Sequence, residues 1–342
     1  MHSKPVLAGI SFMELSRLLS SYPSFRAKQV YSWICTGASS FNDMSNLPLT
    51  LRKELEDKFS LFPCALFSTL TDPDGTVKLG LDLEDGARIE AVILSDGEGR
   101  KTACLSTQAG CPSGCVFCKT GTLGFRRNLS AAEIAGQFLQ LKIKEPEISH
   151  IVIMGMGEPL LNLENLRAAI DFIMDPAGLN ISKRRITLST CGIEKGIIDL
   201  CDNGPDIRLA LSLTAAREEL RKRLMPITQG NPLPLVKKAL IQYQKKMKKR
   251  ITLEMVLLSG INMEMHDAQA LAEFAKGLDV VINLIPWNSV DGLEFEGKPL
   301  CPPSANEIAV FTAALESLDL KITRRFAKGQ SVSGACGQLG VV

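Results

Sequence analysis

The run GCPSGCVFC at residues 110–118 places Cys111, Cys115 and Cys118 in one short loop, and the run itself offers no fourth thiol. A closed structural zinc site takes four Cys or His ligands, and a 4Fe–4S cluster normally takes four thiolates. Three thiolates therefore suggest a cluster with one iron left open. Open coordination positions are where metals do chemistry, so the spacing indicates an enzyme.

A zinc site completed by a remote ligand is the alternative interpretation of this loop. The chain has three histidines, His2, His150 and His266, and none stands in a ligand-like pair. Five other cysteines lie in apolar or mixed surroundings, where a small buried side chain is the expected role. They are Cys35, Cys64, Cys191, Cys201 and Cys301.

Composition sets the class of protein. The chain has 342 residues, 45% of them hydrophobic, and a formal net charge of +2, so whole-molecule charge does not indicate a polyanion partner. No apolar run approaches the roughly 18–20 residues that cross a bilayer, and the first residues lack a continuous signal-peptide core. We expect a cytoplasmic protein that has no membrane partner and is long enough to bury a large core.

The hydrophobic pattern changes along the chain and predicts four segments. Residues 1–61 have helical spacing, and residues 62–100 read as strands separated by DPDG and EDG turns. Residues 101–325 repeat a strand, loop and helix pattern. Residues 326–342 form a glycine-rich C-terminal loop.

Seven strand-like segments after residue 101 alternate with helical runs, and alternation of this kind builds parallel strands with helices outside. The strands are TACLS (102–106), SHIVIM (149–154), RRITLS (184–189), IRLALSL (207–213), RITLEMVLL (250–258), VVINLI (280–285) and LKITR (320–324). The helical run 129–144 carries Ser130 and Glu133 at the spacing of a capping box. We predict an α/β fold with a partial or full β/α barrel, whose site lies in the loops after the strands.

Two of these loops carry further candidate site residues. In MGMGEP (154–159), glycines let backbone approach a ligand closely, and Glu158 could accept a hydrogen bond from an ammonium group. A plain glycine turn closed by proline is the alternative. Near the C-terminus, Cys336 lies among small residues that would let a mobile loop carry its thiol into a cleft. An incidental thiol on a flexible terminus is the alternative.

Cys104 and Glu90 lie at the ends of predicted strands. Cys104 is a thiol outside the cysteine triplet, and two thiols that can meet may form a transient disulfide. Glu90 taken alone reads as a solvated strand carboxylate.

The three-cysteine run with an aromatic residue before its last cysteine, opening a β/α series, resembles the radical S-adenosylmethionine (SAM) enzymes. Further matches in chain order resemble the RlmN family of RNA adenine-C2 methyltransferases and their relatives, the Cfr adenine-C8 methyltransferases. These include FRAKQVYSWI, CLSTQAGC, GFRRNL, MGMGEPLLN, RRITLSTCG, RLMPI, NLIPWN and ACGQL, and they span nearly the whole chain. The resemblance implies a radical SAM partial β/α barrel with an N-terminal helical, RNA-binding module and a small β extension.

Carried over by position, the resemblance implies a role for each candidate. The triplet would hold a 4Fe–4S cluster, Cys336 would become methylated, Cys104 would be the resolving thiol, and Glu90 would be the proton acceptor near the base. Residues implied to contact SAM are Gly157, Glu158, Ser189, Ser212, Leu213, Thr214 and Asn288.

Two departures from the family pattern are visible. The family usually has histidine where this chain has Thr214, which keeps a hydrogen-bonding group but loses a titratable one. The run SVSGACG (331–337) stands where the family usually has an acidic DIDAACG-like run, although the cysteine is intact.

The resemblance also implies a mechanism that consumes two SAM molecules. One methylates Cys336, and the other is cleaved reductively to a radical that takes a hydrogen from the S-methyl group. The methylene radical adds to the ring carbon, and a Cys104–Cys336 disulfide then frees the product. Implied substrates are 23S rRNA at the peptidyl-transferase centre and the tRNA adenosine 3′ to the anticodon.

Basic clusters could hold RNA phosphates while the target base is unstacked into a pocket. Arg126–Arg127 and Arg324–Lys328 are the preferred candidates because they flank the two chemical loops. The other clusters are Lys183–Arg185, Arg221–Arg223 and Lys245–Arg250.

Two alternatives stay open at this point: C8 methylation of the same ribosomal adenosine, and an iron–sulfur RNA-binding protein without methyl transfer. GFRRNL and the N-terminal segments look closer to RlmN than to Cfr. The resemblance further implies an electron donor such as flavodoxin or ferredoxin, and we expect a monomer.

Overall fold

One ten-stranded sheet organises the molecule, and its strand order is β1-β2-β3-β4-β7-β8-β9-β10-β11-β14. The structure, a computed structural model, describes residues 4–324 and 328–340. The strands of this sheet are β1 (Cys64–Thr71), β2 (Val77–Leu83), β3 (Arg88–Ser95), β4 (Lys101–Cys104), β7 (His150–Ile153), β8 (Ile186–Thr190), β9 (Arg208–Ser212), β10 (Ile251–Leu257), β11 (Val280–Pro286) and β14 (Ile322–Arg324).

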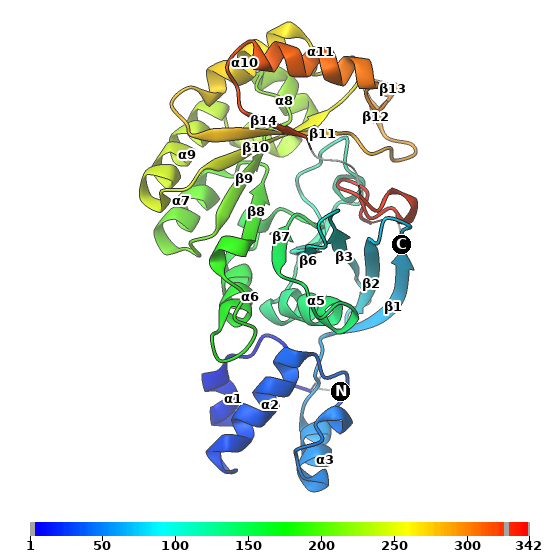
Figure 1. Cartoon of the computed structure of the whole chain (residues 1–342), viewed down its shortest axis with the longest axis vertical. Coiled ribbons are helices and arrows are strands. Elements are labelled where there is room, and N and C mark those ends of the chain that lie inside the picture. The colour runs from blue at the N-terminus through cyan, green and yellow to red at the C-terminus, as the bar shows by residue number, and fades with distance from the viewer. Residues whose placement is uncertain (1–3, 325–327, 341–342) are drawn as a thin grey trace.

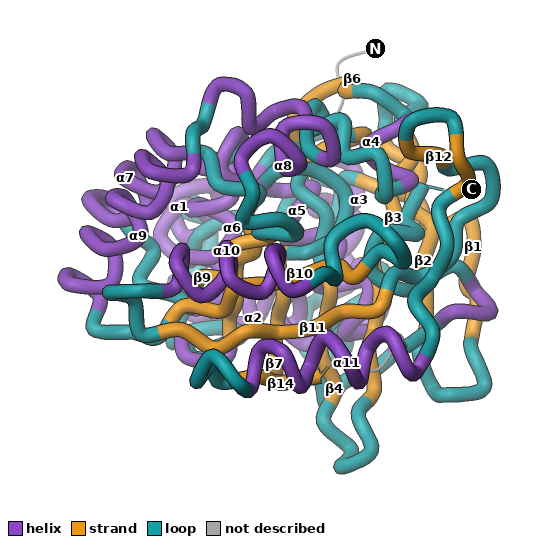
Figure 2. Tube along the Cα trace, turned by 90° about the horizontal axis from the view of Figure 1, so that it is seen from above, coloured by secondary structure: helices purple, strands orange, loops and turns teal. Residues whose placement is uncertain are grey.

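Strands β4 to β14 run parallel and are joined through helices, so the predicted α/β fold with a partial barrel is confirmed. The sheet is open, since β14 is an end strand and has no partner in β4 among the described residues. Figure 2 shows helices such as α7 and α9 outside the curved strands. The helices of this part are α5 (Ala131–Lys144), α6 (Leu163–Met174), α7 (Glu194–Asn203), α8 (Glu218–Leu224), α9 (Leu233–Met247), α10 (Met265–Ala275) and α11 (Ala305–Glu316).

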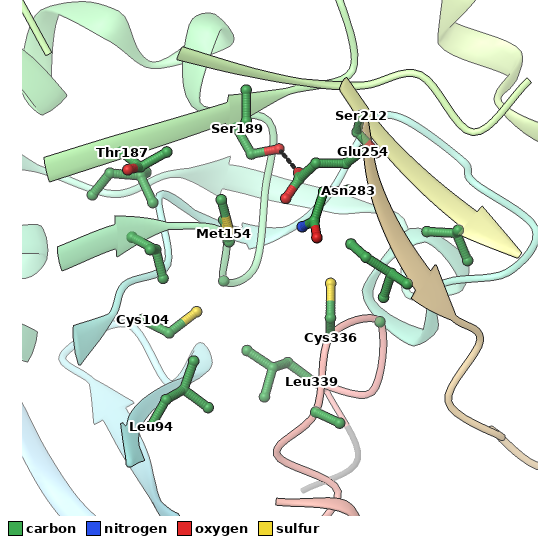
Figure 3. Close-up of a pocket in the computed structure, with 18 of the residues that line it drawn as sticks. Leu94, Cys104, Met154, Thr187, Ser189, Ser212, Glu254, Asn283, Cys336 and Leu339 are labelled. Carbon is green, nitrogen blue, oxygen red and sulfur yellow. Dashed lines mark hydrogen bonds between the residues drawn. The ribbon is translucent and has the colours of Figure 1, made fainter. Parts of the chain in front are cut away.

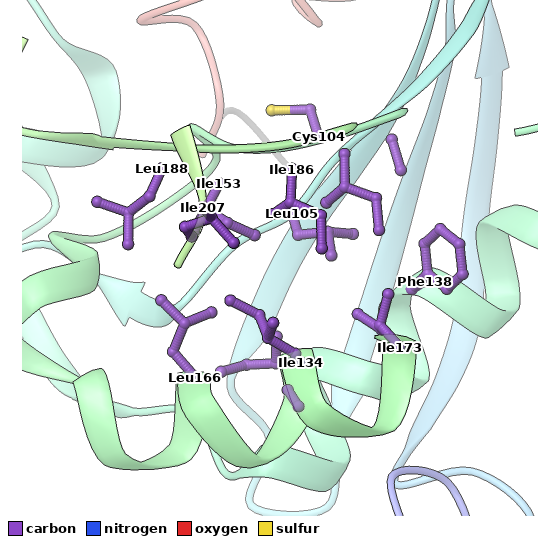
Figure 4. Packing of buried hydrophobic residues seen from close by; sticks show 14 of the residues in the cluster. Cys104, Leu105, Ile134, Phe138, Ile153, Leu166, Ile173, Ile186, Leu188 and Ile207 are labelled. Carbon is purple, nitrogen blue, oxygen red and sulfur yellow. The ribbon is translucent and has the colours of Figure 1, made fainter. Parts of the chain in front are cut away.

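Helix α5 begins as its sequence predicts. The Ser130 side chain accepts a hydrogen bond from the Glu133 backbone N–H, and the Glu133 carboxylate accepts one from the Ser130 N–H. This reciprocal pair satisfies two backbone donors that a helix leaves unbonded at its start. Ile134 and Phe138 then face the sheet (Figure 4), where they pack with Ile153 and other buried strand residues.

The strands β1 to β3 continue the barrel sheet instead of forming a separate layer. They pair antiparallel with one another, and β3 pairs antiparallel with β4. The Asp72 and Asp85 side chains accept backbone hydrogen bonds from Asp74 and Ala87 and thereby shape the two turns. The C-terminal loop lies beside these strands (Figure 1), so this extension connects the barrel to the tail.

Three helices form the N-terminal module, namely α1 (Phe12–Leu18), α2 (Ser24–Thr36) and α3 (Leu49–Lys58). The Ser11 hydroxyl caps α1, and Gly37 ends α2 in a left-handed conformation at φ 88°. The module lies at one end of the molecule, below α5 in Figure 1. Its Tyr31 hydroxyl donates a hydrogen bond to Asp175 across 2.6 Å, which ties α2 to the loop after α6.

Five short elements were not predicted from the sequence. They are α4 (Lys119–Thr122), the hairpin of β5 (Gln108–Gly110) and β6 (Phe125–Asn128), and the pair β12 (Glu294–Phe295) and β13 (Lys298–Pro299). Their sequences are short and contain no apolar run or alternation that would mark a strand or helix. Within the described ranges, no helix combines the length and apolar character that a bilayer span demands.

Candidate active site

A cavity of about 870 Å³ opens inside the curve of the sheet. The cysteine loop, several strands and the C-terminal loop all contribute to its wall. Ten of the thirteen candidate site residues line this cavity. They are Cys104, Cys111, Cys115, Cys118, Gly157, Glu158, Ser189, Ser212, Asn288 and Cys336.

The β5–β6 hairpin folds the cysteine loop. The Cys111 N–H donates a hydrogen bond to the Gly124 carbonyl at 2.8 Å, which extends the pairing of β5 and β6 to the base of the cysteine loop. Gly110 has φ +75°, and a Cβ there would lie 2.0 Å from the Gly124 oxygen, so only glycine fits. The indole of Trp287 donates to the Phe117 carbonyl at 2.8 Å and holds the other end of the loop.

The three thiols of this loop are close enough to interact. Burial raises the pKa of each of them, and the Cys111 and Cys118 thiols raise the pKa of Cys115 further. Bound iron would reverse this tendency because a positive metal stabilises a coordinating thiolate. The donor set therefore suits a 4Fe–4S cluster with three protein ligands.

A single metal ion makes a different geometric demand. In the part of the chain that the structure describes, no three His, Cys, Asp or Glu side chains converge as the ligands of one ion would. In a 4Fe–4S cluster each thiolate binds its own iron, so the three sulfurs stand further apart than the ligands of one ion.

The loop after β7 is held tightly in place. Gly157 has φ +106°, and a Cβ there would lie 2.6 Å from the Gln108 side chain. The Glu158 N–H donates to the Gln108 Oε1 at 2.8 Å. The backbone at Gly157 is thus exposed to the cavity at a position that no other residue could occupy without strain.

The Glu158 carboxylate is already bonded within the protein. It accepts hydrogen bonds from the Thr190 hydroxyl at 2.7 Å, the Cys191 N–H at 2.7 Å and the Leu160 N–H at 3.0 Å. Burial raises its pKa, and these donors act in the opposite direction. Glu158 therefore joins the loops after β7 and β8, while part of its surface still lines the cavity.

Ser189, Ser212 and Glu254 form a polar strip across neighbouring strands. The Ser189 hydroxyl donates to the Glu254 Oε2 at 2.6 Å, and all three side chains face the cavity (Figure 3). Glu254 was not singled out from the sequence, because a glutamate inside an apolar strand gives no motif signal. It is nonetheless buried at 6% exposure.

Leu213 and Thr214 are the two SAM-contact candidates that do not line the cavity. Both are fully buried, and both donate backbone N–H bonds to the Glu254 carbonyl. Thr214 has φ +55°, a strained value for a β-branched residue, and its hydroxyl has no hydrogen-bond partner in the described chain. Their contact with SAM remains a prediction.

The C-terminal loop carries Cys336 into the cavity. The Asn288 side chain donates to the Cys336 carbonyl at 2.9 Å, and the Asp72 carboxylate accepts from both the backbone and hydroxyl of Ser331. Figure 3 shows Cys104 on the sheet side and Cys336 on the loop side of the same space. The fold thus brings two thiols that are 232 positions apart in the sequence to one cavity.

Glu90 lies beside the cavity without lining it. Its carboxylate pairs with the buried Lys78 ammonium at 2.9 Å and accepts the Gly340 N–H at 2.5 Å. The end of the tail therefore covers this carboxylate. A role in proton transfer to or from a bound base stays a prediction, and it requires the tail to withdraw from Glu90.

The basic clusters differ in whether their arginines form ion pairs within the protein. Arg127 pairs with Asp85 and Glu133, and its hydrogen bond to Asp85 lowers the pKa of that carboxyl group. By contrast Arg184, Arg185 and Arg208 line the cavity at the amino ends of β8 and β9, without an ion pair in the described chain. Of the Arg324–Lys328 cluster, residues 325–327 lie outside the described residues, while Arg324 and Lys328 line the cavity.

Comparison with known proteins agrees with this geometry. The Radical SAM superfamily model matches residues 105–272, and the Ribosomal RNA large subunit methyltransferase N-terminal domain model matches residues 7–61. A protein of Treponema denticola named "Probable dual-specificity RNA methyltransferase RlmN" is 48% identical, covering 98% of this chain and 96% of its own. The chain belongs to the RlmN family.

Two further similar proteins also match most of the chain. A protein of Thermus thermophilus with the same name is 40% identical and covers 93% of this chain and 89% of its own. The crystal structure of a radical SAM methyltransferase from Sphaerobacter thermophilus has a TM-score of 0.92 at 33% identity, with 98% and 99% of the two chains covered. The predicted radical SAM fold and the predicted activity of a SAM-dependent RNA methyltransferase are confirmed.

Proposed function

We propose that this chain methylates C2 of adenosine in RNA through a methylcysteine at Cys336, with a 23S rRNA adenosine at the peptidyl-transferase centre and the tRNA adenosine 3′ to the anticodon as targets. The observation that carries the proposal is that Cys104, Cys336 and the three-cysteine loop line one cavity. Two thiols that share one cavity suit a reaction in which one carries the methyl group and the other releases it. The relatives' name, dual-specificity RNA methyltransferase, supports two classes of RNA.

A 4Fe–4S cluster would be held by Cys111, Cys115 and Cys118, and when bound there it would supply the one-electron chemistry that the cleavage of SAM requires. Gly157 offers its backbone to SAM, and Ser189, Ser212 and Asn288 offer polar groups on the same cavity wall. Trp287 and Phe117, both buried, exclude water behind the cysteine loop.

Cys336 performs the first transfer by displacement on SAM. Its thiolate forms a bond to the methyl carbon, and S-adenosylhomocysteine leaves with the electron pair of the broken bond. The side chain is exposed to the cavity, while Asn288 fixes the backbone at Cys336 through its carbonyl. The methyl group is therefore presented on an anchored loop.

Cys104 performs the release. Its thiolate attacks the Cys336 sulfur, a disulfide forms, and the bond from sulfur to the methylene carbon breaks. The electron pair of that bond passes to the carbon, which takes a proton and becomes the methyl group. The ring proton lost from C2 needs a base, and Glu90 is our candidate once Gly340 has moved away from it.

RNA would approach the edge where Arg184, Arg185 and Arg208 stand. These side chains are exposed and line the cavity, so their charges can meet phosphates while a base enters. The N-terminal module supplies a second surface for RNA. We further propose that the protein is a cytoplasmic monomer that receives electrons from a flavodoxin or a ferredoxin.

The test of function is mass spectrometry of RNA nucleosides. Anaerobically reconstituted protein, SAM, a reductant and unmodified 23S rRNA or tRNA should yield 2-methyladenosine. A Cys336→Ala variant should yield none, while a Cys301→Ala variant, which alters an exposed cysteine outside the cavity, should retain activity. Formation of 8-methyladenosine, or methylation by Cys336→Ala, would refute the assignment.

A further inference from the structure

Arg221 is a buried cation that forms no ion pair in the described chain, and the carboxylates of Glu158 and Glu218 act on it only from beyond ion-pair distance. Its side chain, on α8, is 1% exposed, and no carboxylate in the described chain lies within ion-pair distance of it. Its Nε donates to the Leu213 carbonyl at 3.1 Å and its Nη2 to the Cys191 carbonyl at 2.6 Å. Its Nη1 is buried and has no hydrogen-bond partner in the described residues. Burial of an unpaired charge is costly and calls for an explanation.

The cysteine loop lies against the segment that carries Arg221. The Val116 N–H donates to the Leu224 carbonyl at 3.1 Å, and the Ile227 N–H donates to the Ser113 carbonyl at 3.3 Å. These two bonds hold α8 and the turn after it along the back of the loop. Leu220 and Leu224, which lie on either side of Arg221 in α8, pack in one cluster with Phe117 of the cysteine loop. The buried guanidinium therefore lies on a helix that is packed directly against this loop.

We propose that Arg221 is the counter-cation of the iron–sulfur cluster and raises the cluster's reduction potential. The inference rests on the proposed cluster at Cys111, Cys115 and Cys118. Three thiolates make the site negative, and one-electron reduction adds a further negative charge. Net charge and hydrogen bonding near the sulfurs are the main determinants of such potentials. A fixed positive charge in a dry environment stabilises the reduced state more than the oxidised one.

A purely structural role is the competing explanation. Arg221 joins the loops after β8 and β9 through carbonyls of Cys191, Ser212 and Leu213. Loss of those bonds could lower activity without any effect of charge. A readout of charge is therefore needed, and lysine is the informative substitution because it keeps the charge but loses the planar array of donors.

The experiment compares Arg221→Gln, Arg221→Lys and a matched control, Arg223→Gln. Arg223 lies on the same helix, but its side chain is 52% exposed and pairs with Glu296. Each protein is reconstituted anaerobically, and the reduced cluster is followed by electron paramagnetic resonance during a potentiometric titration. Cluster content and circular dichroism are recorded for each protein.

For Arg221→Gln we expect at least a tenfold lower ratio of reduced to oxidised cluster at a fixed applied potential, which equals 59 mV for a one-electron couple. Arg221→Lys should recover most of that shift, and Arg223→Gln should match the parent protein. An unchanged potential in Arg221→Gln, or equal shifts in the glutamine and lysine variants, would overturn the inference.

A second measurement uses the unaltered protein and so does not depend on whether the variants fold. With arginine labelled uniformly with ¹⁵N, pulsed electron paramagnetic resonance of the reduced cluster should show modulation from a nearby ¹⁵N nucleus. Absence of that modulation contradicts the placement. If the unaltered protein forms no cluster, both this inference and the proposed function fail. If the cluster forms but its reduction potential does not depend on Arg221, only the inference fails.

Discussion

Cys104 has one task in the proposed chemistry, which is to release RNA from Cys336. A Cys104→Ala variant should still form the covalent bond between Cys336 and the RNA base. It should be unable to break that bond, because no second thiolate attacks the Cys336 sulfur. We expect RNA-dependent, slowly migrating protein on a denaturing gel, and nuclease treatment should collapse it to the mass of the chain plus a nucleotide fragment. The buried Cys201, on α7 and away from the cavity, provides the control Cys201→Ala. Normal turnover by Cys104→Ala would exclude it as the resolving thiol.

Gly157 tests how the loop after β7 meets SAM. Alanine there would place a Cβ 2.6 Å from the Gln108 side chain at φ +106°. We expect Gly157→Ala to bind SAM at least tenfold more weakly. Its free energy of unfolding, measured in urea, should be lower by about 1–3 kcal/mol. Gly292→Ala is the matched control. It introduces the same backbone strain, at φ +77°, but its added Cβ has no neighbouring atom within 4 Å.

Equilibrium dialysis with labelled SAM measures the first effect, and equal affinity in the two alanine variants would contradict it. The comparison separates the close contact at Gly157 from backbone strain alone.

The cysteine triplet, Glu158, Cys104 and Cys336 were candidates from the short runs in which they stand, and the structure places all of them around one cavity, while their roles stay predictions. The placement of Arg221 and Cys191 could not be predicted in this way. Arg221 sits in RKRL among charged neighbours and looks like part of a solvated helix face, whereas the fold buries it. Cys191 was assigned to buried packing, and it is buried, but it also lines the cavity. Such placements arise only when distant elements are packed together.

At the scale of elements, the amino ends of β8 and β9 form the basic edge of the cavity. Substitution of Arg184 or Arg208 by glutamine should weaken RNA binding across sequences. Each lost phosphate contact should reduce the slope of log affinity against log salt by about 1. Filter binding at several salt concentrations measures both quantities.

Arg127→Gln provides the contrast. Because Arg127 pairs with Asp85 and Glu133, we expect a lower free energy of unfolding and a nearly unchanged salt slope. A larger loss of salt dependence in Arg127→Gln than in Arg184→Gln would restore the preference that the sequence alone suggested.

The barrel strands were predictable because their apolar runs repeat with helices between them, and all seven are present. The hairpin β5–β6 was missed because its strands, QAG and FRRN, contain no apolar run. The continuity of β1–β3 with the barrel sheet was missed as well. Strand pairing over such separations depends on the whole sheet, and local pattern does not encode it.

At the scale of the molecule, the N-terminal module must stay docked if it is to present RNA to the barrel. Gly178 lies where the two meet, and a Cβ there would be 2.6 Å from the Cys35 sulfur and 2.8 Å from the Tyr31 ring. Gly178→Ala should therefore weaken the contact between the N-terminal module and the barrel, and it should lower the free energy of unfolding by about 1–3 kcal/mol.

Calorimetry should then show a lower unfolding temperature or a broader transition for Gly178→Ala. A separate binding measurement should show weaker affinity for tRNA. Gly230→Ala, which meets no atom within 4 Å, should behave as the parent protein does. Unchanged stability and binding in Gly178→Ala would show that the docking tolerates the added methyl group.

The central claim is that the methyl group passes through Cys336 and loses one hydrogen on the way. Reconstituted protein supplied with SAM bearing a CD₃ group tests this directly. The account expects 2-methyladenosine with two deuterium atoms in its methyl group, and 5′-deoxyadenosine with one. A product that keeps all three deuterium atoms would show direct displacement on SAM and contradict the account.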